Sequence, residues 1–192
     1  YYDYPKSLEA YQKAADCYGR AGKIRHRNYM WLNQSDVCRN MEQYDESERL
    51  LRMTLESAKK EHDSSLTKLC LASLMMQYVE QRQIPMAKEI YQELELLVDD
   101  NYGSASYMGA LVRMYMSEQN FFLVKQCLDK GWKRAVTCTD SINLYLTSSD
   151  VLFASGDERT AYQELLKGVL MQNKETRQAL QQPVLTAQRD YL

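Results

Sequence analysis

The sequence is poor in the residues that make turns, with 7 glycines and 3 prolines among 192 residues. That scarcity disfavours sandwiches and barrels, which need many turns, whereas helices joined by short connections tolerate it. The residues that dominate the sequence include Glu, Gln, Lys, Arg, Leu, Met and Ala, all of which are strong helix formers. The composition therefore predicts an all-α fold.

The chain also lacks an excess of charge of one sign, because 24 Lys and Arg against 26 Asp and Glu leave a formal net charge of −2. Proteins that bind nucleic acid usually carry a concentrated basic face, so no nucleic-acid partner is expected for this segment. The longest basic cluster, Lys23 to Arg27, is interpreted as a solvated turn. No run approaches the roughly 18 apolar residues needed to span a membrane, so no membrane insertion is expected within this segment.

The sequence begins at Tyr1 rather than at a methionine, and no signal peptide is visible. We therefore expect it to be a piece of a longer chain, whose other parts would carry any targeting or membrane segment. This interpretation leaves the compartment open between the cytoplasm and the periplasm.

Groups that could carry catalysis are scarce. The two histidines, His26 and His62, are both predicted to lie in inter-helix turns, without an HExxH motif or a cysteine partner. Gly19 to Gly22 follows no strand, so it does not resemble a phosphate-binding loop. The cysteines form no CxxC motif and are interpreted as small buried residues: Cys17, Cys38, Cys70, Cys127 and Cys138. We therefore expect no catalytic residue, metal or cofactor, and predict that the protein is not an enzyme.

An internal repeat is the strongest positive feature. Five stretches share a small residue, a large residue four positions later, and a small or apolar residue three positions after that. They are Ser7/Tyr11/Ala14, Ser47/Leu51/Thr54, Ala87/Tyr91/Leu94, Val124/Leu128/Gly131 and Ala161/Leu165/Gly168. Their first members are 40, 40, 37 and 37 residues apart (47−7, 87−47, 124−87, 161−124). This regularity predicts a tandem array of similar helical units.

Each of the last four stretches follows another helical pattern, in which apolar or small residues at three- and four-residue spacing place one stripe inward. The rows are Trp31/Ser35/Cys38, Leu71/Leu74/Met75/Tyr78, Met108/Leu111/Val112/Tyr115 and Tyr145/Ser149/Leu152. Asp45 and Asp157 are predicted N-caps, since each precedes an acidic residue and a helical pattern. Pro85 suits the first turn of a helix, and Gly156 suits the end of one.

These patterns resemble the tetratricopeptide repeat, whose first helix carries an apolar, a small and a Tyr position and whose second carries Ala, an aromatic residue and Ala. The closest matches are Met30 to Cys38, Met86 to Tyr91 and Gly156 to Tyr162. The resemblance covers Tyr4 to about Lys174, although the period is 37 to 40 residues rather than 34. Degenerate repeats of this length resemble those of bacterial signalling regulators, including two-component regulators, that carry the array ahead of an output module.

The resemblance implies a right-handed α-solenoid of antiparallel helix pairs that forms a single repeat domain over residues 1–182. The expected units are a partial pair at 1–22 and pairs at about 24–61, 64–99, 103–136 and 140–181. Gln181, Gln182 and Pro183 are predicted to interrupt the last helix. Residues 183–192 would then form either a capping helix over the last repeat or a connector to a further domain.

In such arrays the first helices of the pairs line a concave surface that binds partners. By periodicity, the residues turned away from the inward stripe are Tyr29, Leu32, Asp36, Arg39, Leu69, Ala72, Met76, Val79, Ser106, Gly109, Arg113, Met116, Asn143, Leu146, Asp150 and Phe153. This mixed surface is expected to take an extended or helical peptide. The acidic C-termini of chaperones are not expected as ligands, because Leu32, Asp36 and Leu69 stand where a basic and amide clamp would be needed.

The sequence therefore predicts a protein- or peptide-binding module, interpreted as the sensor or regulatory region of a larger bacterial signal-transduction or transcription-regulating protein. The alternative is a structural scaffold subunit of a permanent assembly, with self-association through exposed end faces. An enzyme is the third and least favoured interpretation, because the sequence brings no titratable groups together in a recognisable catalytic motif.

Overall fold

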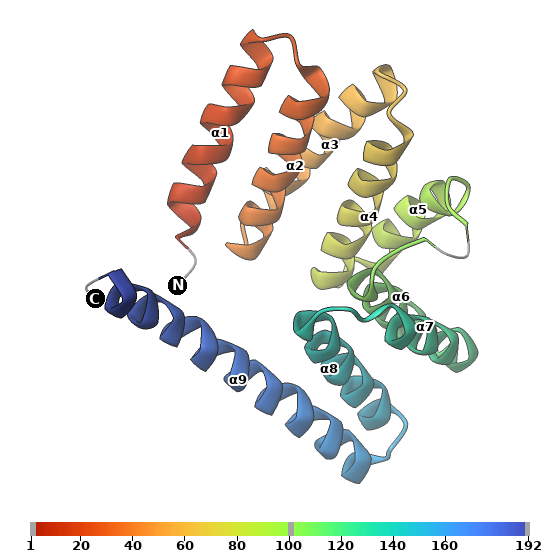
Figure 1. Cartoon of the computed structure of the whole chain (residues 1–192). Coiled ribbons are helices and arrows are strands. Elements are labelled where there is room, and N and C mark those ends of the chain that lie inside the picture. Colours follow the sequence, from red (N-terminus) through yellow and green to blue (C-terminus); the bar gives the residue numbers. More distant parts are fainter. Residues whose placement is uncertain (1–2, 100–101, 191–192) are drawn as a thin grey trace. The chain divides into compact units, whose positions relative to one another are not determined.

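A computed structural model describes residues 3–99 and 102–190, with side chains up to residue 178 apart from that of Ser106. The part of the chain so described contains nine α-helices joined by turns and one longer connection (Figure 1). The chain divides into two compact units, Tyr1–Asn101 and Tyr102–Leu192, which are described separately. The predicted all-α class is confirmed, whereas the single repeat domain expected over residues 1–182 stays a prediction.

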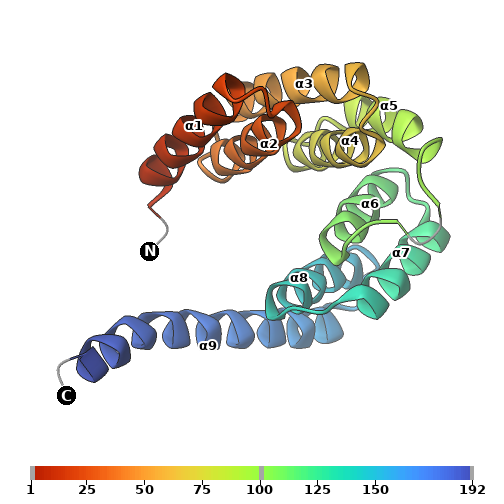
Figure 2. The same cartoon turned by 45° about the horizontal axis from the view of Figure 1, so that its top comes forward.

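The first unit contains helices that pack consecutively against one another (Figures 1 and 2). They are α1 (Tyr4–Arg20), α2 (Ile24–Asn40), α3 (Tyr44–Lys60), α4 (Ser64–Glu80) and α5 (Ile84–Glu95). Each of the first four is 17 residues long and is followed by a three-residue turn, so the helices begin at 20-residue intervals. Two such intervals make the 40-residue period of the sequence repeat.

The second unit contains α6 (Ala105–Ser117), α7 (Phe121–Arg134), α8 (Cys138–Ala154) and α9 (Glu158–Asp190). Here α6 packs against α7 and α8 packs against α9, and α6 also contacts α8. The predicted sequential antiparallel helix pairs are therefore confirmed in both units. We call α2, α4, α6 and α8 the first helices, and α1, α3, α5, α7 and α9 the second helices.

The same three-residue turn recurs at six positions, and its middle residue always has a left-handed backbone. The φ values are 66° at Gly22, 58° at Glu42, 53° at His62, 59° at Arg82, 57° at Gln119 and 85° at Gly156. In every case the N–H of the third turn residue donates to a carbonyl five residues earlier, as from Lys23 to Tyr18 at 2.9 Å. This Schellman bond satisfies a carbonyl at the helix end and turns the chain back on itself.

Some of the predicted helix boundaries are correct and others are wrong. Asp157 accepts a hydrogen bond from the backbone N–H three residues later at 3.1 Å, so it is the N-cap that the sequence indicated. Pro85 lies in the first turn of α5, as predicted. The prediction for Asp45 was wrong, because the turn ends at Gln43 and α3 begins at Tyr44. Asp45 instead lies in the first turn of the helix, where its negative charge interacts favourably with the positive end of the helix dipole.

The basic cluster at Lys23 to Arg27 is not a turn. The turn after α1 uses only three residues, so α2 begins at Ile24 and the cluster forms most of its first turn. His26 accordingly lies in a helix rather than in a turn, with its ring centroid 5.1 Å from that of Tyr18. His62 does lie in a turn, as predicted.

The predicted interruption at Pro183 is also wrong for the backbone, because α9 continues from Glu158 to Asp190. A proline has a φ compatible with a helix and removes a single N–H donor, so a long helix can continue past it, often with a bend. The side chains from residue 179 and the whole of residues 191–192 lie outside the described residues. The capping or connector role of residues 183–192 therefore stays a prediction.

The repeated motif occupies the same positions in every second helix. Its first member is the fourth residue of the helix, so that Ala87 stands three residues after Ile84 in α5. The fourth residues of α3, α5, α7 and α9 are almost wholly buried: Ser47, Ala87, Val124 and Ala161. The small size of these residues therefore reflects close packing against neighbouring helices.

The eleventh position of α7 illustrates the same constraint. A Cβ atom added to Gly131 would lie 2.8 Å from the Leu144 side chain and 3.3 Å from the Cβ of Met108. Both neighbours belong to first helices, α8 and α6, so α7 approaches both of them at this residue. A larger side chain would have to displace the Leu144 side chain and push against Met108.

Two glycines near the end of α1 differ in backbone conformation, so their substitution by alanine should have opposite effects. Gly22 has a φ of 66° and open space around its Cβ position, whereas Gly19 is helical with its nearest neighbour at 3.5 Å. We expect Gly22→Ala to lower the free energy of unfolding by about 1 kcal/mol, because alanine is strained in the left-handed region. Gly19→Ala should instead raise it by about 0.5–1 kcal/mol through helix propensity. Urea unfolding measures both, and equal signs would contradict the turn geometry.

The register of the second helices is tested at Ala87, whose side chain is wholly buried. We expect Ala87→Leu to overpack α5 against its neighbours and to lower the free energy of unfolding by about 1–3 kcal/mol. Ala10→Leu is the matched control, since Ala10 is exposed on α1 and both substitutions leave helix propensity almost unchanged. Thermal denaturation measures both variants, and a neutral Ala87→Leu would refute this register.

Candidate partner-binding surface

The first helices α2 and α4 lie side by side and are joined by ion pairs near both ends. In the first turn of α2, the Nε of Arg25 lies 2.9 Å from the carboxylate of Asp63, the N-cap of α4. Near the other end, a terminal nitrogen of Arg39 lies 3.5 Å from the carboxylate of Glu80. The two helices therefore run in the same direction. Their predicted site residues form what we call the α2–α4 face: Tyr29, Leu32, Asp36, Arg39, Leu69, Ala72, Met76 and Val79.

On α2, the predicted site residues differ in how much surface they offer. Leu32 is buried, whereas Tyr29, Asp36 and Arg39 are each partly exposed. A second terminal nitrogen of Arg39 lies 3.4 Å from Asp36, so this arginine joins carboxylates of both helices. A charge reversal at Arg39 would consequently disturb the contact between α2 and α4 as well as any partner.

On α4, Leu69 is 40% exposed and Met76 is partly exposed, whereas Ala72 and Val79 are buried. Leu69 and Met76 are the sixth and thirteenth residues of the helix, and the exposed residues of α2 include the same positions, Tyr29 and Asp36. The accessible part of the α2–α4 face is therefore built mainly from these two positions.

Glu80 belongs to this face although it was absent from the predicted set. It is the last residue of α4 and stands four residues after Met76, the spacing that places helical side chains on one side. That spacing was the available signal. The face consequently carries one basic and two acidic side chains, Arg39 with Asp36 and Glu80.

In the second unit, α6 and α8 are the neighbouring first helices. Gly109 of α6 is buried, and a Cβ atom there would lie 3.5 Å from the hydroxyl of Thr147 on α8. Arg113 is exposed and Met116 is partly exposed. The side chain of Ser106 lies outside the described residues. A Cβ atom at position 109 would thus make an ordinary van der Waals contact with α8.

The residues predicted on α8 divide in a similar way. Asp150 and Phe153 are exposed, the latter by 47%, and Asn143 is partly exposed. Leu146 is turned toward α9, because a Cβ atom on Gly168 would lie 3.3 Å from one of its methyl groups. Leu146 therefore belongs in part to the contact between α8 and α9.

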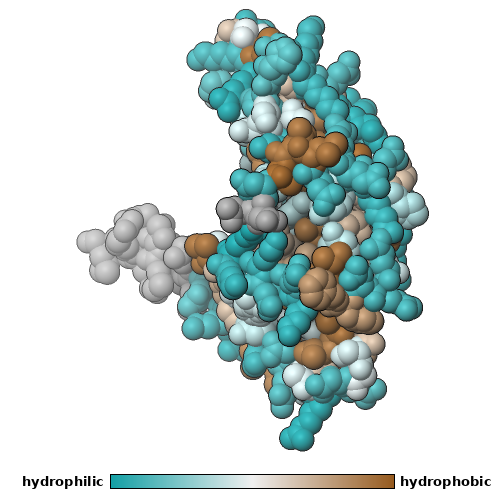
Figure 3. Space-filling model, turned by 90° about the vertical axis from the view of Figure 1, so that its right-hand side faces the viewer, coloured by the Kyte–Doolittle hydropathy of each residue, from teal (hydrophilic) through white to brown (hydrophobic). Residues whose placement is uncertain are grey.

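The predicted residues of α6 and α8 form the α6–α8 face: Ser106, Gly109, Arg113, Met116, Asn143, Leu146, Asp150 and Phe153. The structure thus brings together the predicted residues of neighbouring first helices within each unit. A continuous groove across both units stays a prediction. Figure 3 shows one side of the molecule, on which hydrophobic side chains gather in small patches within a mostly hydrophilic surface.

Burial governs the electrostatics of the α2–α4 face. Desolvation raises the pKa of the Asp36 carboxyl, and the nearby guanidinium of Arg39 opposes this rise. Burial also raises the pKa of the Cys70 thiol to about 12, with further contributions from Asp36 and Asp63. Since the thiolate is the reactive form of cysteine, Cys70 is inert near neutral pH.

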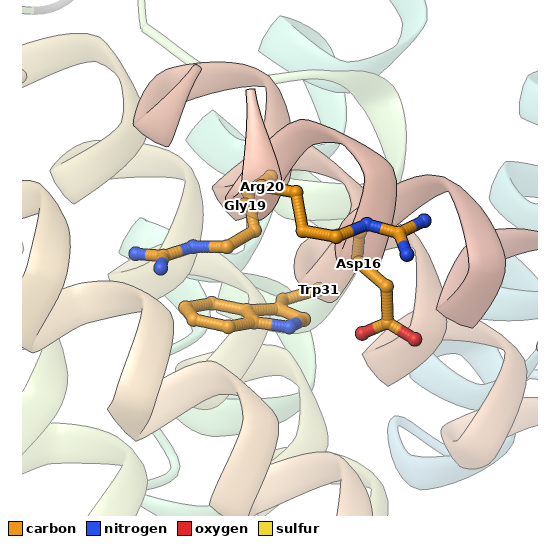
Figure 4. A pocket seen from close by; sticks show the side chains of 6 residues that line it. Asp16, Gly19, Arg20 and Trp31 are labelled. Atoms are coloured by element: carbon orange, nitrogen blue, oxygen red, sulfur yellow. The ribbon is translucent and has the colours of Figure 1, made fainter. Parts of the chain in front are cut away.

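A hollow of about 530 Å³ between α1 and α2 was not predicted (Figure 4). Its lining consists of Ala15, Asp16, Gly19, Arg20, Arg27 and Trp31. The guanidinium carbon of Arg27 lies 4.2 Å from the ring centroid of Trp31, and the buried Nε of Arg27 has no hydrogen-bond partner. Figure 4 shows Asp16 and Arg20 to one side of the Trp31 ring. The four-residue spacing of Arg27 and Trp31 was the only signal for this stack.

Within residues 3–99 and 102–190, no three His, Cys, Asp or Glu side chains are grouped so as to hold a metal ion. The described helices also include none that is long and apolar enough to cross a membrane. All five cysteines are free thiols.

The geometry defines an all-helical protein with sequential antiparallel helix pairs, most of whose helices are near 17 residues long. Comparison of the chain with family models, with curated proteins and with solved structures gave no match. The more specific family assignment consequently depends on the residue pattern alone and enters only as part of a proposal.

The raised pKa of Asp36 gives a prediction with a definite sign. Folding favours its protonated form, so its contribution to stability is present below the usual pKa of 3.8 and is lost as the pH rises through the folded-state pKa. We expect the stability of Asp36→Asn relative to the wild type to increase between about pH 4 and about pH 7. Urea unfolding at several pH values measures this difference.

Asp157→Asn is the control of opposite sign. Hydrogen bonds from Thr160 lower the pKa of Asp157, so its contribution to stability is present above the usual pKa and is lost as the pH falls. The stability of Asp157→Asn relative to the wild type should therefore decrease as the pH rises toward about 4 and then stay level up to about pH 7, without the increase expected for Asp36→Asn. Parallel trends in the two variants would contradict the assignment for Asp36.

Proposed function

We propose that this chain is a tetratricopeptide-like α-solenoid that binds a protein or peptide on its first helices, through the α2–α4 face and the α6–α8 face. It is a binding module rather than an enzyme. The proposal rests on a division of labour between positions. The fourth residues of α3, α5, α7 and α9 are buried, as at Ser47 and Ala161, whereas the sixth and thirteenth residues of α2, α4 and α8 remain accessible.

The chemistry of the two faces indicates the kind of ligand. Leu69 and Met76 on α4, and Phe153 on α8, offer apolar contact area beside charged side chains. Arg113 and Asp150 are the exposed charges of the α6–α8 face. A peptide with spaced apolar side chains and a few charged ones fits such surfaces, because the apolar contacts supply affinity and the charges fix its direction.

The role in the cell is proposed on the resemblance alone. Degenerate repeats of 37 to 40 residues resemble those of bacterial signalling regulators, in which the array senses a ligand and an output module responds. On this basis we assign the chain to the sensor or regulatory region of a larger signal-transduction or transcription-regulating protein. Ligand binding to the first-helix faces would then be the input.

The binding function can be tested without knowing the natural ligand. A displayed library of random linear peptides is selected against the intact chain, and the affinity of the selected peptides is measured by fluorescence anisotropy. We expect Leu69→Glu or Phe153→Glu to weaken the selected peptides by roughly tenfold or more, about 1.4 kcal/mol, because each introduces an unpaired charge beneath an apolar contact.

Phe122→Glu is the matched control, since Phe122 is 72% exposed but lies on the second helix α7. It should leave the affinity unchanged, and circular dichroism should show all three variants to be folded. Peptides that bind every variant equally well, or a library that yields no binder, would refute the assignment of the binding surface to the first helices.

A further inference from the structure

In the first unit, two second helices use the same side to contact the first helix that follows. Gln12, eight residues after Tyr4 in α1, accepts a hydrogen bond from the side chain of Gln34 on α2 at 3.0 Å. Arg52, eight residues after Tyr44 in α3, donates to the hydroxyl of Tyr78 on α4 at 2.7 Å. The ninth position of a second helix thus faces the next first helix.

Neighbouring positions on the same side make equivalent contacts. Glu48, the fifth residue of α3, accepts a hydrogen bond from the same Tyr78 hydroxyl at 2.7 Å. In the second unit, Trp132 is the twelfth residue of α7, and its ring centroid lies 4.8 Å from that of Tyr145 on α8 in an edge-to-face arrangement. Positions five, nine and twelve therefore mark the side on which a following first helix packs.

In α9 these positions are apolar and exposed. Tyr162, Leu166 and Val169 are the fifth, ninth and twelfth residues from Glu158, and Leu170 adjoins them. Their exposed fractions are 62%, 44%, 38% and 59%. We call these four residues the α9 row. Clustered exposed apolar side chains of this kind mark interaction sites, because their contact with water is unfavourable.

The contact of α9 with α8 uses a different side of the helix. The buried residues of α9, among those whose side chains are described, are Ala161 and Gly168, the fourth and eleventh positions. At 100° per residue, the α9 row is turned away from them by roughly a third of a circle. The α9 row is thus open to a further helix that packs as α2 packs on α1, or as α8 packs on α7.

The charges beside the α9 row indicate the chemistry of that helix. Arg159 lies three residues before Tyr162, and Arg177 lies seven residues after Leu170, which places both on the same side of α9. Both are exposed, and 18 residues (177−159) separate them, about 27 Å along the helix. The row therefore has an apolar centre with a cation toward each end.

We propose that the α9 row binds an amphipathic α-helix of a partner protein, antiparallel to α9, with an apolar centre and an acidic residue near each end. This surface lies on a second helix, so the proposal is separate from the binding assigned to the α2–α4 and α6–α8 faces. The occupant takes the position that a first helix takes in the three internal examples, and its acidic residues pair with Arg159 and Arg177.

A second copy of the chain fits the same row less well. Antiparallel pairing of two α9 helices about residue 168, the midpoint between Arg159 and Arg177 and close to the centre of the α9 row, places Arg159 of one copy opposite Arg177 of the other. Such a pair brings like charges together at both ends of the contact, which is unfavourable. The charge pattern therefore favours a different helix with acidic ends.

The probe is a set of stapled 17-residue helical peptides with leucines along one face and glutamates at both ends, in several leucine registers. Binding to the intact chain is measured by fluorescence anisotropy. We expect at least one peptide to bind saturably, and Leu166→Asp combined with Leu170→Asp to weaken it by roughly tenfold or more. The control Phe122→Asp, at an exposed apolar residue on α7, should leave binding unchanged.

Reversal of the two charges tests whether the partner helix is acidic at its ends. The double variant Arg159→Glu and Arg177→Glu should bind the glutamate-ended peptide more weakly than the wild type does. It should bind the matching lysine-ended peptide more tightly. Both arginines are exposed, so the variant should keep the melting temperature of the wild type. Failure of the exchange to reverse the preference would overturn the acidic character of the partner.

Other outcomes overturn the proposal as a whole. One is the absence of binding by every peptide in the set, and another is binding that the Leu166 and Leu170 substitutions do not affect. A third is a dimer in sedimentation analysis that the same substitutions abolish and that the peptides do not displace, which would assign the row to a second copy. Leu69→Glu should leave peptide binding here unchanged, so a failure of the proposed function is distinguishable from a failure at α9.

Discussion

The three-residue turn with a left-handed middle residue is the constraint on which the arrangement within each unit depends. Its Schellman bond ends one helix at a fixed residue, and the next helix begins directly afterwards. Helices of 17 residues therefore start every 20 residues in the first unit, and neighbours are forced to be antiparallel. Four of the six middle residues are not glycine, at a cost of about 1–3 kcal/mol each. Packing of the flanking helices must offset that cost, so turn and interface depend on each other.

These turns also explain why some boundaries were predictable from the sequence and others were not. Glycine is the middle residue of two of the six turns, at Gly22 and Gly156, and Asp157 adds a capping side chain after the second. At Glu42 the middle residue carries no such signal, so the start of α3 was predicted two residues late. The apolar period was the better guide, because burial at positions four and eleven depends on helix geometry and not on the residues of the turn.

The candidate site was less predictable than the fold, because helical periodicity assumes a single buried stripe. α4 contacts α2, α3 and α5, so burial extends over most of its circumference and includes Ala72 and Val79. Buried polar residues add a second difficulty. Gln77 of α4 is wholly buried and donates to the carbonyl of Tyr44 at 3.0 Å, and Asn28 of α2 bonds to Ser57 of α3 at 2.9 Å. Polar side chains such as these are usually expected on the surface. Only the tertiary contacts reveal that they join helices.

Such polar contacts between helices bear on specificity as much as on stability. An apolar contact tolerates sliding of one helix along another, whereas a buried amide loses its partner when the helices shift by one residue. Gln12 with Gln34, and Tyr78 with Glu48 and Arg52, thus fix the register of successive helices in the first unit. The α9 row has no amide or charged side chain at the equivalent positions, which are Tyr162, Leu166 and Val169. The affinity for a helix bound there would come from buried apolar surface area, and its register would have to be fixed by charges such as those of Arg159 and Arg177. An interface within the chain can rely on buried polar contacts for its register, whereas a site for a reversibly bound partner relies on apolar area and surface charges. The residues of the α9 row fit a reversibly bound partner.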